Sequence, residues 1–138
     1  MNTYTPPMPY VTWDYNKEDH IFDAESRVRT MVDAYLEAAV WAEKPDEEDW
    51  DGANWSQSAL DLAHFDCCAF LRLAKGNIKG WDMSQLGHDF WLTRNGHGVS
   101  FVDRDFSGGF ERKELYDLAK VFKEEYVYLG DDGKLYLG

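Results

Sequence analysis

The polar residues of one central segment, residues 87–105, are the ones whose types suggest chemistry. The segment reads GHDFWLTRNGHGVSFVDRD, and its polar groups include His88, Arg94, His97, Asp103, Arg104 and Asp105. An imidazole, a carboxylate and a guanidinium are the acid, base and cationic groups that a phosphodiesterase or nuclease uses. His88, Asp103 and Arg94 are therefore the candidate catalytic residues of a small hydrolase or nuclease-like enzyme.

The apolar residues of the same segment predict a β-hairpin over residues 87–105. Its turn falls at Asn95-Gly96, because this dipeptide accepts the positive φ angles of a tight turn. In that register His88 lies opposite Asp103, so a carboxylate orients the imidazole across two strands. The alternation of side chains then places Phe90, Leu92, Val99 and Phe101 on one face and Asp89, Trp91 and Ser100 on the other.

These polar residues also have a structural explanation. A histidine opposite an aspartate stabilises the base of a hairpin, and the glycines answer the backbone requirements of the turn. The set has no recognisable nucleophile, His88 and His97 lie nine residues apart on opposite strands, and the adjacent Cys67 and Cys68 have the wrong spacing for a zinc pair. We therefore expect a protein that is not an enzyme and that holds no metal and no cofactor.

Length and composition predict one domain. The chain has 138 residues, of which 44% are hydrophobic and 16% aromatic, enough to bury one core but too few for two independent ones. No apolar run is long enough to span a bilayer, and the N-terminus has no basic segment of a signal peptide. We expect a single domain over residues 23–138 in the cytoplasm, without a membrane partner and with both cysteines reduced.

The net charge of −12 is concentrated in the first half of the chain. Residues 1–66 contain 15 acidic and 4 basic side chains, whereas residues 67–138 contain 11 acidic and 10 basic ones. A nucleic-acid-binding protein gathers positive charge on one face, so we expect no direct binding to DNA or RNA. A concentrated negative field instead attracts a basic protein surface.

The order of the elements predicts an α+β domain. Residues 1–22 contain three prolines among aromatics and form an extended arm, which either packs back on the domain, binds a partner or mediates a homodimer. Apolar spacing predicts amphipathic helices from Ala24 to about residue 44, over residues 59–75 after a cap at Ser58, and over residues 111–125. A C-terminal hairpin over residues 126–138 completes a fold of three helices packed on a small antiparallel sheet made of two hairpins.

The second half of the chain resembles a family of small uncharacterised proteins of tailed bacteriophages. The likeness rests on the residues 87–98 followed by Phe101 and Asp103-Arg104, on LGDDG at 129–133 followed by Leu135-Tyr136, and on Asp66-Cys67 with Phe70 upstream. Val99-Ser100 and Val102 depart from the pattern, where related sequences usually carry Gly or Trp. The resemblance implies a phage-encoded protein in the cytoplasm of a bacterial host, and it brings no catalytic residues.

An acidic loop over residues 45–56 is the candidate partner-binding site. Five of the six residues from Asp46 to Asp51 are acidic, and aromatics lie inside or beside the charge. Carboxylates spaced along this loop and the first helix can imitate a phosphate backbone, and aromatic residues supply interface anchors. The predicted site comprises Asp46, Glu47, Glu48, Asp49, Trp50, Asp51 and Trp55.

The sequence thus favours an acidic, DNA-mimic-like inhibitor. We expect it to engage a host protein with a basic surface, either one that handles nucleic acid or one that defends the cell against phage. The enzyme centred on His88, Asp103 and Arg94 is the alternative, and a structural or virion role comes third. A solvated acidic face without a partner would account for the same charge.

Overall fold

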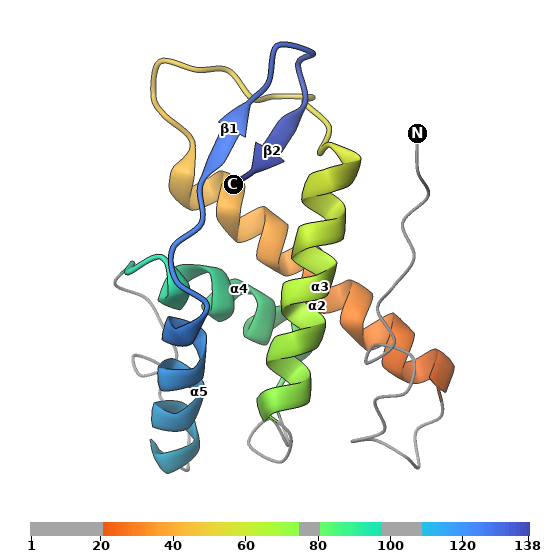
Figure 1. Ribbon diagram of the computed structural model, residues 1–138, viewed down its shortest axis with the longest axis vertical. Helices are drawn as coiled ribbons and strands as arrows, with labels where there is room; N and C mark the ends of the chain where they lie inside the picture. The colour runs from red at the N-terminus through yellow and green to blue at the C-terminus, as the bar shows by residue number, and fades with distance from the viewer. Residues whose placement is uncertain (1–20, 75–80, 98–108) are drawn as a thin grey trace.

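Four helices and one β-hairpin make up the part of the chain that the structure describes. The structure is a computed structural model that describes residues 21–74, 81–97 and 109–138. In chain order the elements are α2 (Ile21–Glu43), α3 (Gln57–Ala74), α4 (Met83–Arg94), α5 (Gly109–Val121), β1 (Val127–Leu129) and β2 (Leu135–Leu137). Figure 1 shows α2 crossing α3, with the hairpin and α5 at opposite ends of the molecule. The α+β class is confirmed, although these ranges hold four helices rather than three.

Helix α2 forms because its apolar residues recur at spacings of three and four. The helix begins at Ile21 rather than Ala24, so residues 21 and 22, assigned above to the N-terminal arm, are helical. The arm residues 1–20 lie outside the described ranges. The predicted apolar stripe is confirmed, since the following side chains are buried: Val28, Met31, Val32, Tyr35, Leu36 and Ala39.

The hairpin predicted over residues 87–105 is wrong where the structure describes it. Residues 83–94 form helix α4, and residues 98–105 lie outside the described ranges. Asp82 caps the start of the helix by accepting a hydrogen bond from the Gln85 N–H at 3.4 Å. At the other end the Asn95 N–H bonds to the Trp91 carbonyl, and Gly96 follows with a φ of 76°. Asn95-Gly96 therefore ends a helix and is not a hairpin turn.

The hairpin was predicted because α4 lacks a polar face. Phe90, Trp91 and Leu92 are each at most 1% exposed, including Trp91, which the hairpin register placed on the opposite face from the other two. Helices α2 and α5 pack against α4, and Phe70 of α3 stacks on Phe90 with ring centroids 4.5 Å apart. A helix enclosed by its neighbours shows no helical period in its sequence, and short apolar runs of this kind are ambiguous between helix and strand.

Helices α3 and α5 are confirmed with shifted ends. Helix α3 is capped by Ser56 rather than Ser58, because the Ser56 hydroxyl accepts the Ala59 N–H at 3.1 Å. Helix α5 ends at Val121, and Lys123 then takes the left-handed conformation with a φ of 65°. The predicted apolar stripe of α5 packs on the core through Leu115, Leu118, Ala119 and Phe122.

The C-terminal hairpin is confirmed and braces the loop before α3. Strand β1 pairs antiparallel with β2, Val127 opposite Leu137 and Leu129 opposite Leu135. On its other side Leu135 pairs with the segment 54–56, donating to the Asn54 carbonyl at 2.9 Å and accepting the Ser56 N–H at 2.8 Å. The described residues therefore contain one hairpin in the sheet rather than two, and its second strand fixes the end of the acidic loop.

Candidate partner-binding surface

The three candidate catalytic residues are not shown to form one site. His88 lies on α4 with its side chain about one third exposed (37%), and its Nδ1 is 3.5 Å from the Asp89 Oδ1. Arg94 is buried, with only 5% of its side chain exposed. Asp103 lies outside the described residues. The predicted pairing of His88 with Asp103 depended on the hairpin register, and α4 removes that argument.

The guanidinium of Arg94 holds the interior together. Its Nη1 donates to the Asp66 Oδ2 and to the Tyr35 hydroxyl, each at 2.8 Å. Its Nε donates to the Lys123 carbonyl at 2.7 Å and its Nη2 to the Phe122 carbonyl at 2.8 Å, so the same side chain caps the end of α5. Four of its five N–H groups are engaged within the core and only 5% of the side chain is exposed, so Arg94 is poorly placed to bind a substrate phosphate.

A second carboxylate joins this network from the C-terminal segment. The Glu125 Oε1 accepts the Tyr35 hydroxyl at 3.0 Å and lies 3.5 Å from the Arg94 Nη1. Burial raises the pKa of Glu125 above its ordinary value, and the Arg94 charge opposes that rise. Burial also raises the pKa of Tyr35, which therefore acts as a neutral donor to Glu125 and as an acceptor from Arg94. The cluster ties α2, α3, α4 and the segment after α5 into one core.

His97 also has a structural partner. Its Nε2 lies 2.6 Å from the Glu43 Oε2, and the same oxygen accepts the Trp91 indole N–H at 3.0 Å. This contact joins the last residue of α2 to the end of α4. Arg94 and His97, two of the polar residues that first suggested chemistry, therefore fix helix ends, whereas His88 lies within α4.

The acidic loop presents its carboxylates on a pinned backbone. Trp50 is only 4% exposed, and its indole N–H donates to the Glu48 carboxylate at 2.8 Å. The Asp49 carboxylate accepts the Asp51 N–H at 2.9 Å, which closes a turn. Trp50 is thus an internal anchor of the loop and not a surface for a partner. Around it the exposed acidic residues are Asp46, Glu47, Glu48, Asp49 and Asp51.

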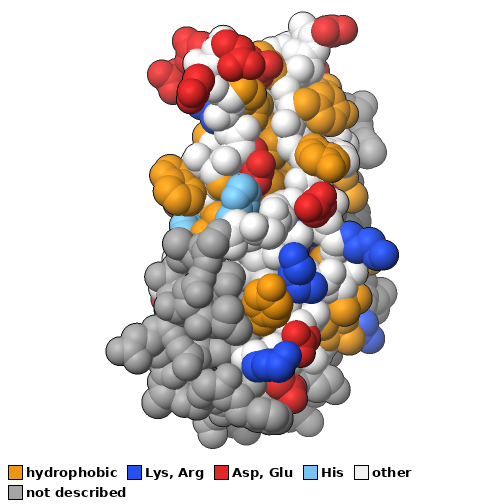
Figure 2. All heavy atoms as spheres, turned by 90° about the vertical axis from the view of Figure 1, so that its left-hand side faces the viewer, with side chains coloured by type: hydrophobic (Ala, Val, Ile, Leu, Met, Phe, Trp, Pro, Cys, Tyr) orange, Lys and Arg blue, Asp and Glu red, His pale blue; other side chains and the backbone are white. Residues whose placement is uncertain are grey.

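The turn of the C-terminal hairpin brings further acids to the same end of the molecule. Figure 1 places this turn and the acidic loop together above the helices, and Figure 2 shows acidic side chains gathered there. Asp131 and Asp132 are both exposed. The hydrogen bond from the Tyr136 hydroxyl to Asp132, at 2.7 Å, lowers the pKa of Asp132 and keeps it ionised. We call the five exposed acids of the loop together with Asp131 and Asp132 the acidic end.

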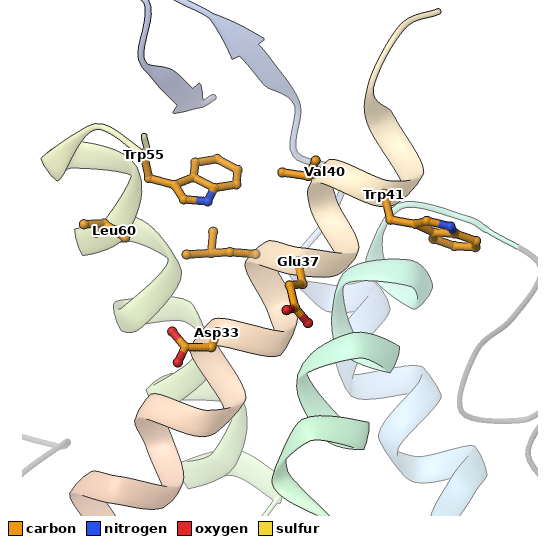
Figure 3. Close-up of a pocket in the computed structure, with 7 residues that line it drawn as sticks. Asp33, Glu37, Val40, Trp41, Trp55 and Leu60 are labelled. Carbon is orange, nitrogen blue, oxygen red and sulfur yellow. The ribbon is translucent and has the colours of Figure 1, made fainter. Parts of the chain in front are cut away.

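A groove of about 720 Å³ opens between α2 and α3, next to the base of the acidic loop. Trp55, just before α3, and Val40 in the last turn of α2 face each other across it in Figure 3, with Leu60 beside Trp55. Asp33 and Glu37 lie one turn apart on α2 along the same groove. The remaining lining residues are Leu36 and Trp41, and the Trp41 side chain lies on the far side of α2 with 71% of its surface exposed.

Sequence reasoning identified Trp55 and the acidic loop, but not the groove. The signal in the sequence was the acid pair Asp33 and Glu37, four residues apart on a helix and without a basic residue four positions after either. Val40 lies on the α2 side of the groove, and Trp55 and Leu60 lie on the α3 side. These residues come together because of the way α2 crosses α3, and the spacing of apolar residues in the sequence does not specify that crossing.

Comparison of the chain with family models, with curated proteins and with solved structures gave no match. The described residues contain neither a helix long and apolar enough to cross a membrane nor a group of three His, Cys, Asp or Glu side chains that could hold a metal ion.

Proposed function

We propose that this protein is a non-enzymatic inhibitor that covers a basic, nucleic-acid-handling surface of a host protein with its acidic end. The observation that carries the proposal is the fixed display of seven exposed carboxylates by two neighbouring turns. Trp50 anchors the loop from inside, and the pairing of segment 54–56 with Leu135 ties it to the hairpin. The phage-type setting expected from the sequence fits such an inhibitor of nucleic-acid enzymes or defence nucleases.

The physics of nucleic-acid binding supports this kind of mimicry. Lys and Arg side chains bind DNA largely by neutralising phosphates, with an affinity that falls steeply as salt rises. Carboxylates held at fixed positions offer the same charge without base pairs. Because the loop is already ordered by its own hydrogen bonds, less conformational entropy is lost on binding than with a free acidic tail.

The enzyme alternative is less well supported by the geometry. Arg94, which would stabilise a transferring phosphate, donates all its short hydrogen bonds within the core. A catalytic cation must reach the substrate, so its burial argues against the set that the sequence suggested.

Paired charge reversals test the proposal. The loop variant Asp46→Lys with Glu47→Lys changes two exposed side chains that form no hydrogen bond with another described residue, so folding should be preserved. The control Asp117→Lys with Glu124→Lys makes the same change in charge on and just after α5, far from the acidic end. It also removes the exposed ion pair between Lys113 and Asp117, a kind of pair that contributes little to stability. Circular dichroism and thermal melting establish that both variants fold.

The binding measurement is affinity capture from a bacterial host lysate over a salt series, with duplex DNA as competitor and mass spectrometry as readout. We expect the wild-type protein and the control to retain a basic nucleic-acid-binding protein, and we expect salt and duplex DNA to release it. The loop variant should lose it. Equal capture by the loop variant at low salt, or capture that duplex DNA does not compete, would show that the acidic end is not a DNA mimic.

A further inference from the structure

The groove between α2 and α3 combines apolar walls with charge that has no partner inside the described protein. Val40, Trp55 and Leu60 are each partly exposed along it. Asp33 and Glu37 are exposed on the same stretch of α2, and neither forms a hydrogen bond or ion pair with another described residue. Like charges four residues apart on a helix repel each other, so a cation placed between them relieves that repulsion.

We propose that this groove receives a basic amphipathic segment of the partner protein, with an apolar side chain inserted against Trp55 and a Lys or Arg bound between Asp33 and Glu37. The inference rests on the proposed function, because it names the second contact made by the same partner. The groove has a volume of about 720 Å³ and is open to solvent, as a docking site for a surface segment must be.

Charge selects the occupant. A nucleic acid or an anionic membrane would be repelled by Asp33, Glu37 and the acidic end together. A second copy of this chain would bring another net charge of −12. A basic protein segment is attracted both by Asp33 and Glu37 and by the acidic end. Its apolar side chain removes the exposed part of Trp55 from water.

The position of the groove allows one partner to use both surfaces. Val40 lies in the last turn of α2, which ends at Glu43 just before the acidic loop, and Trp55 lies where the loop returns to the fold, so the groove adjoins both ends of the loop. Figure 3 shows these two side chains facing each other there. A partner whose segment lies in the groove can therefore also reach the acidic loop, which begins and ends beside it.

Helix geometry predicts the pattern of the occupant. Asp33 and Glu37 are about 6 Å apart along the helix axis, and Val40 is about 10 Å from Asp33. A helical partner segment should thus carry an apolar residue and a Lys or Arg about four to seven positions apart on one face.

Synthetic peptides test this pattern without knowledge of the partner. The matched probe is a fluorescein-labelled helical peptide of about 16 residues with a Leu pair and an Arg pair on one face. A scrambled peptide has the same composition and charge. Anisotropy gives the affinity, and NMR of the Trp55 indole N–H and of the Val40 and Leu60 methyls gives the location. We expect the matched probe to bind at least about tenfold more tightly than the scrambled one and to shift these signals.

Two groove variants complete the test. Asp33→Lys with Glu37→Lys should weaken the matched probe by about tenfold or more, whereas the control Asp117→Lys with Glu124→Lys should change it by less than about twofold. Leu60→Trp fills the groove and should weaken the probe without changing charge. Equal affinity for matched and scrambled peptides, or equal loss in the α2 variant and the control, overturns the groove assignment.

Lysate capture separates this inference from the proposed function. If the α2 variant retains the captured partner as well as the control does and the loop variant loses it, the acidic end acts alone and the groove inference is wrong. If the loop variant also retains the partner, the proposed function itself fails. If the α2 variant and the loop variant both lose the partner while the control retains it, the result supports the groove inference and the proposed function together.

Discussion

Replacing Gly87 with alanine should destabilise the protein, although alanine is the better helix former. Gly87 lies in α4 where this helix meets α2. A Cβ atom built on Gly87 would come within 2.1 Å of the Met31 carbonyl oxygen and 3.0 Å of the Tyr35 backbone nitrogen. Both atoms belong to the backbone of α2, so no side-chain rotation relieves the contact. The two helices would have to move apart.

Two opposing terms set the size of the effect. Gly→Ala in a helix interior gains about 1 kcal/mol from propensity. Separating α2 from α4 by about 1 Å forfeits a quarter to a half of the dispersion energy of the atoms that lose contact, and overpacking of this kind costs about 1–3 kcal/mol or more. The loss is at the upper end here because Met31, Tyr35 and Phe90 are fully buried at or near this interface. We expect a net loss of about 2 kcal/mol, which is a fall in Tm of about 8 °C.

Urea unfolding followed by circular dichroism measures this loss, with Ser84→Ala as the control. Ser84 is an exposed position of the same helix, so its replacement should leave stability unchanged or raise it slightly. A hairpin at these residues would respond in the opposite direction, because alanine is favoured over glycine in a strand. An unchanged or raised stability for Gly87→Ala would refute the close contact of α2 and α4 at this point.

Two further predictions concern the buried network. Arg94→Met should lower the free energy of unfolding, measured by urea titration, by about 3–5 kcal/mol, because it leaves Asp66 and two helix-end carbonyls without their donor. If Arg94→Lys restored more than half of the lost free energy of unfolding, the four hydrogen bonds of the guanidinium would not be the cause. Glu125→Gln should become more stable relative to the wild type as pH rises from about 4 to about 7. The reason is that the raised pKa of Glu125 favours its protonated form in the folded state, so its stabilising contribution is complete below its unfolded pKa and is lost as pH rises through the folded one. Parallel pH curves for the two proteins would show that this carboxyl is not perturbed.

The amphipathic elements were predictable from the sequence because each has one face toward water. Helix α2 shows this most clearly, since Val28, Met31 and Tyr35 are buried while Asp33 and Glu37 are exposed. Helices α3 and α5 and the C-terminal hairpin follow the same logic, with shifts only at their ends. Local signals of this kind survive because tertiary packing reinforces them.

Helix α4 was not predictable in the same way. Its side chains are buried on several faces at once, and the dipeptide that ends it, Asn95-Gly96, has the composition of a hairpin turn. Both structures use a residue with positive φ, which only Gly supplies without strain. The choice between them depends on α2, whose backbone approaches Gly87 too closely for any other residue, and this information is far away in the chain.

Some charged side chains of this protein are paired in the core, and others are exposed acids that form no ion pair with another described residue. Arg94 and Asp66 are joined by a short hydrogen bond at the edge of the core, so Arg94, which the sequence suggested as a catalytic residue, stabilises the fold. The carboxylates of the acidic end and of the groove instead add to a net charge of −12, which opposes the compact state by self-repulsion. Trp50 and the pairing of β2 with segment 54–56 nevertheless hold that charge in place. Internal contacts therefore fix a set of like charges at one end of the molecule, which is the arrangement that the proposed basic partner would neutralise.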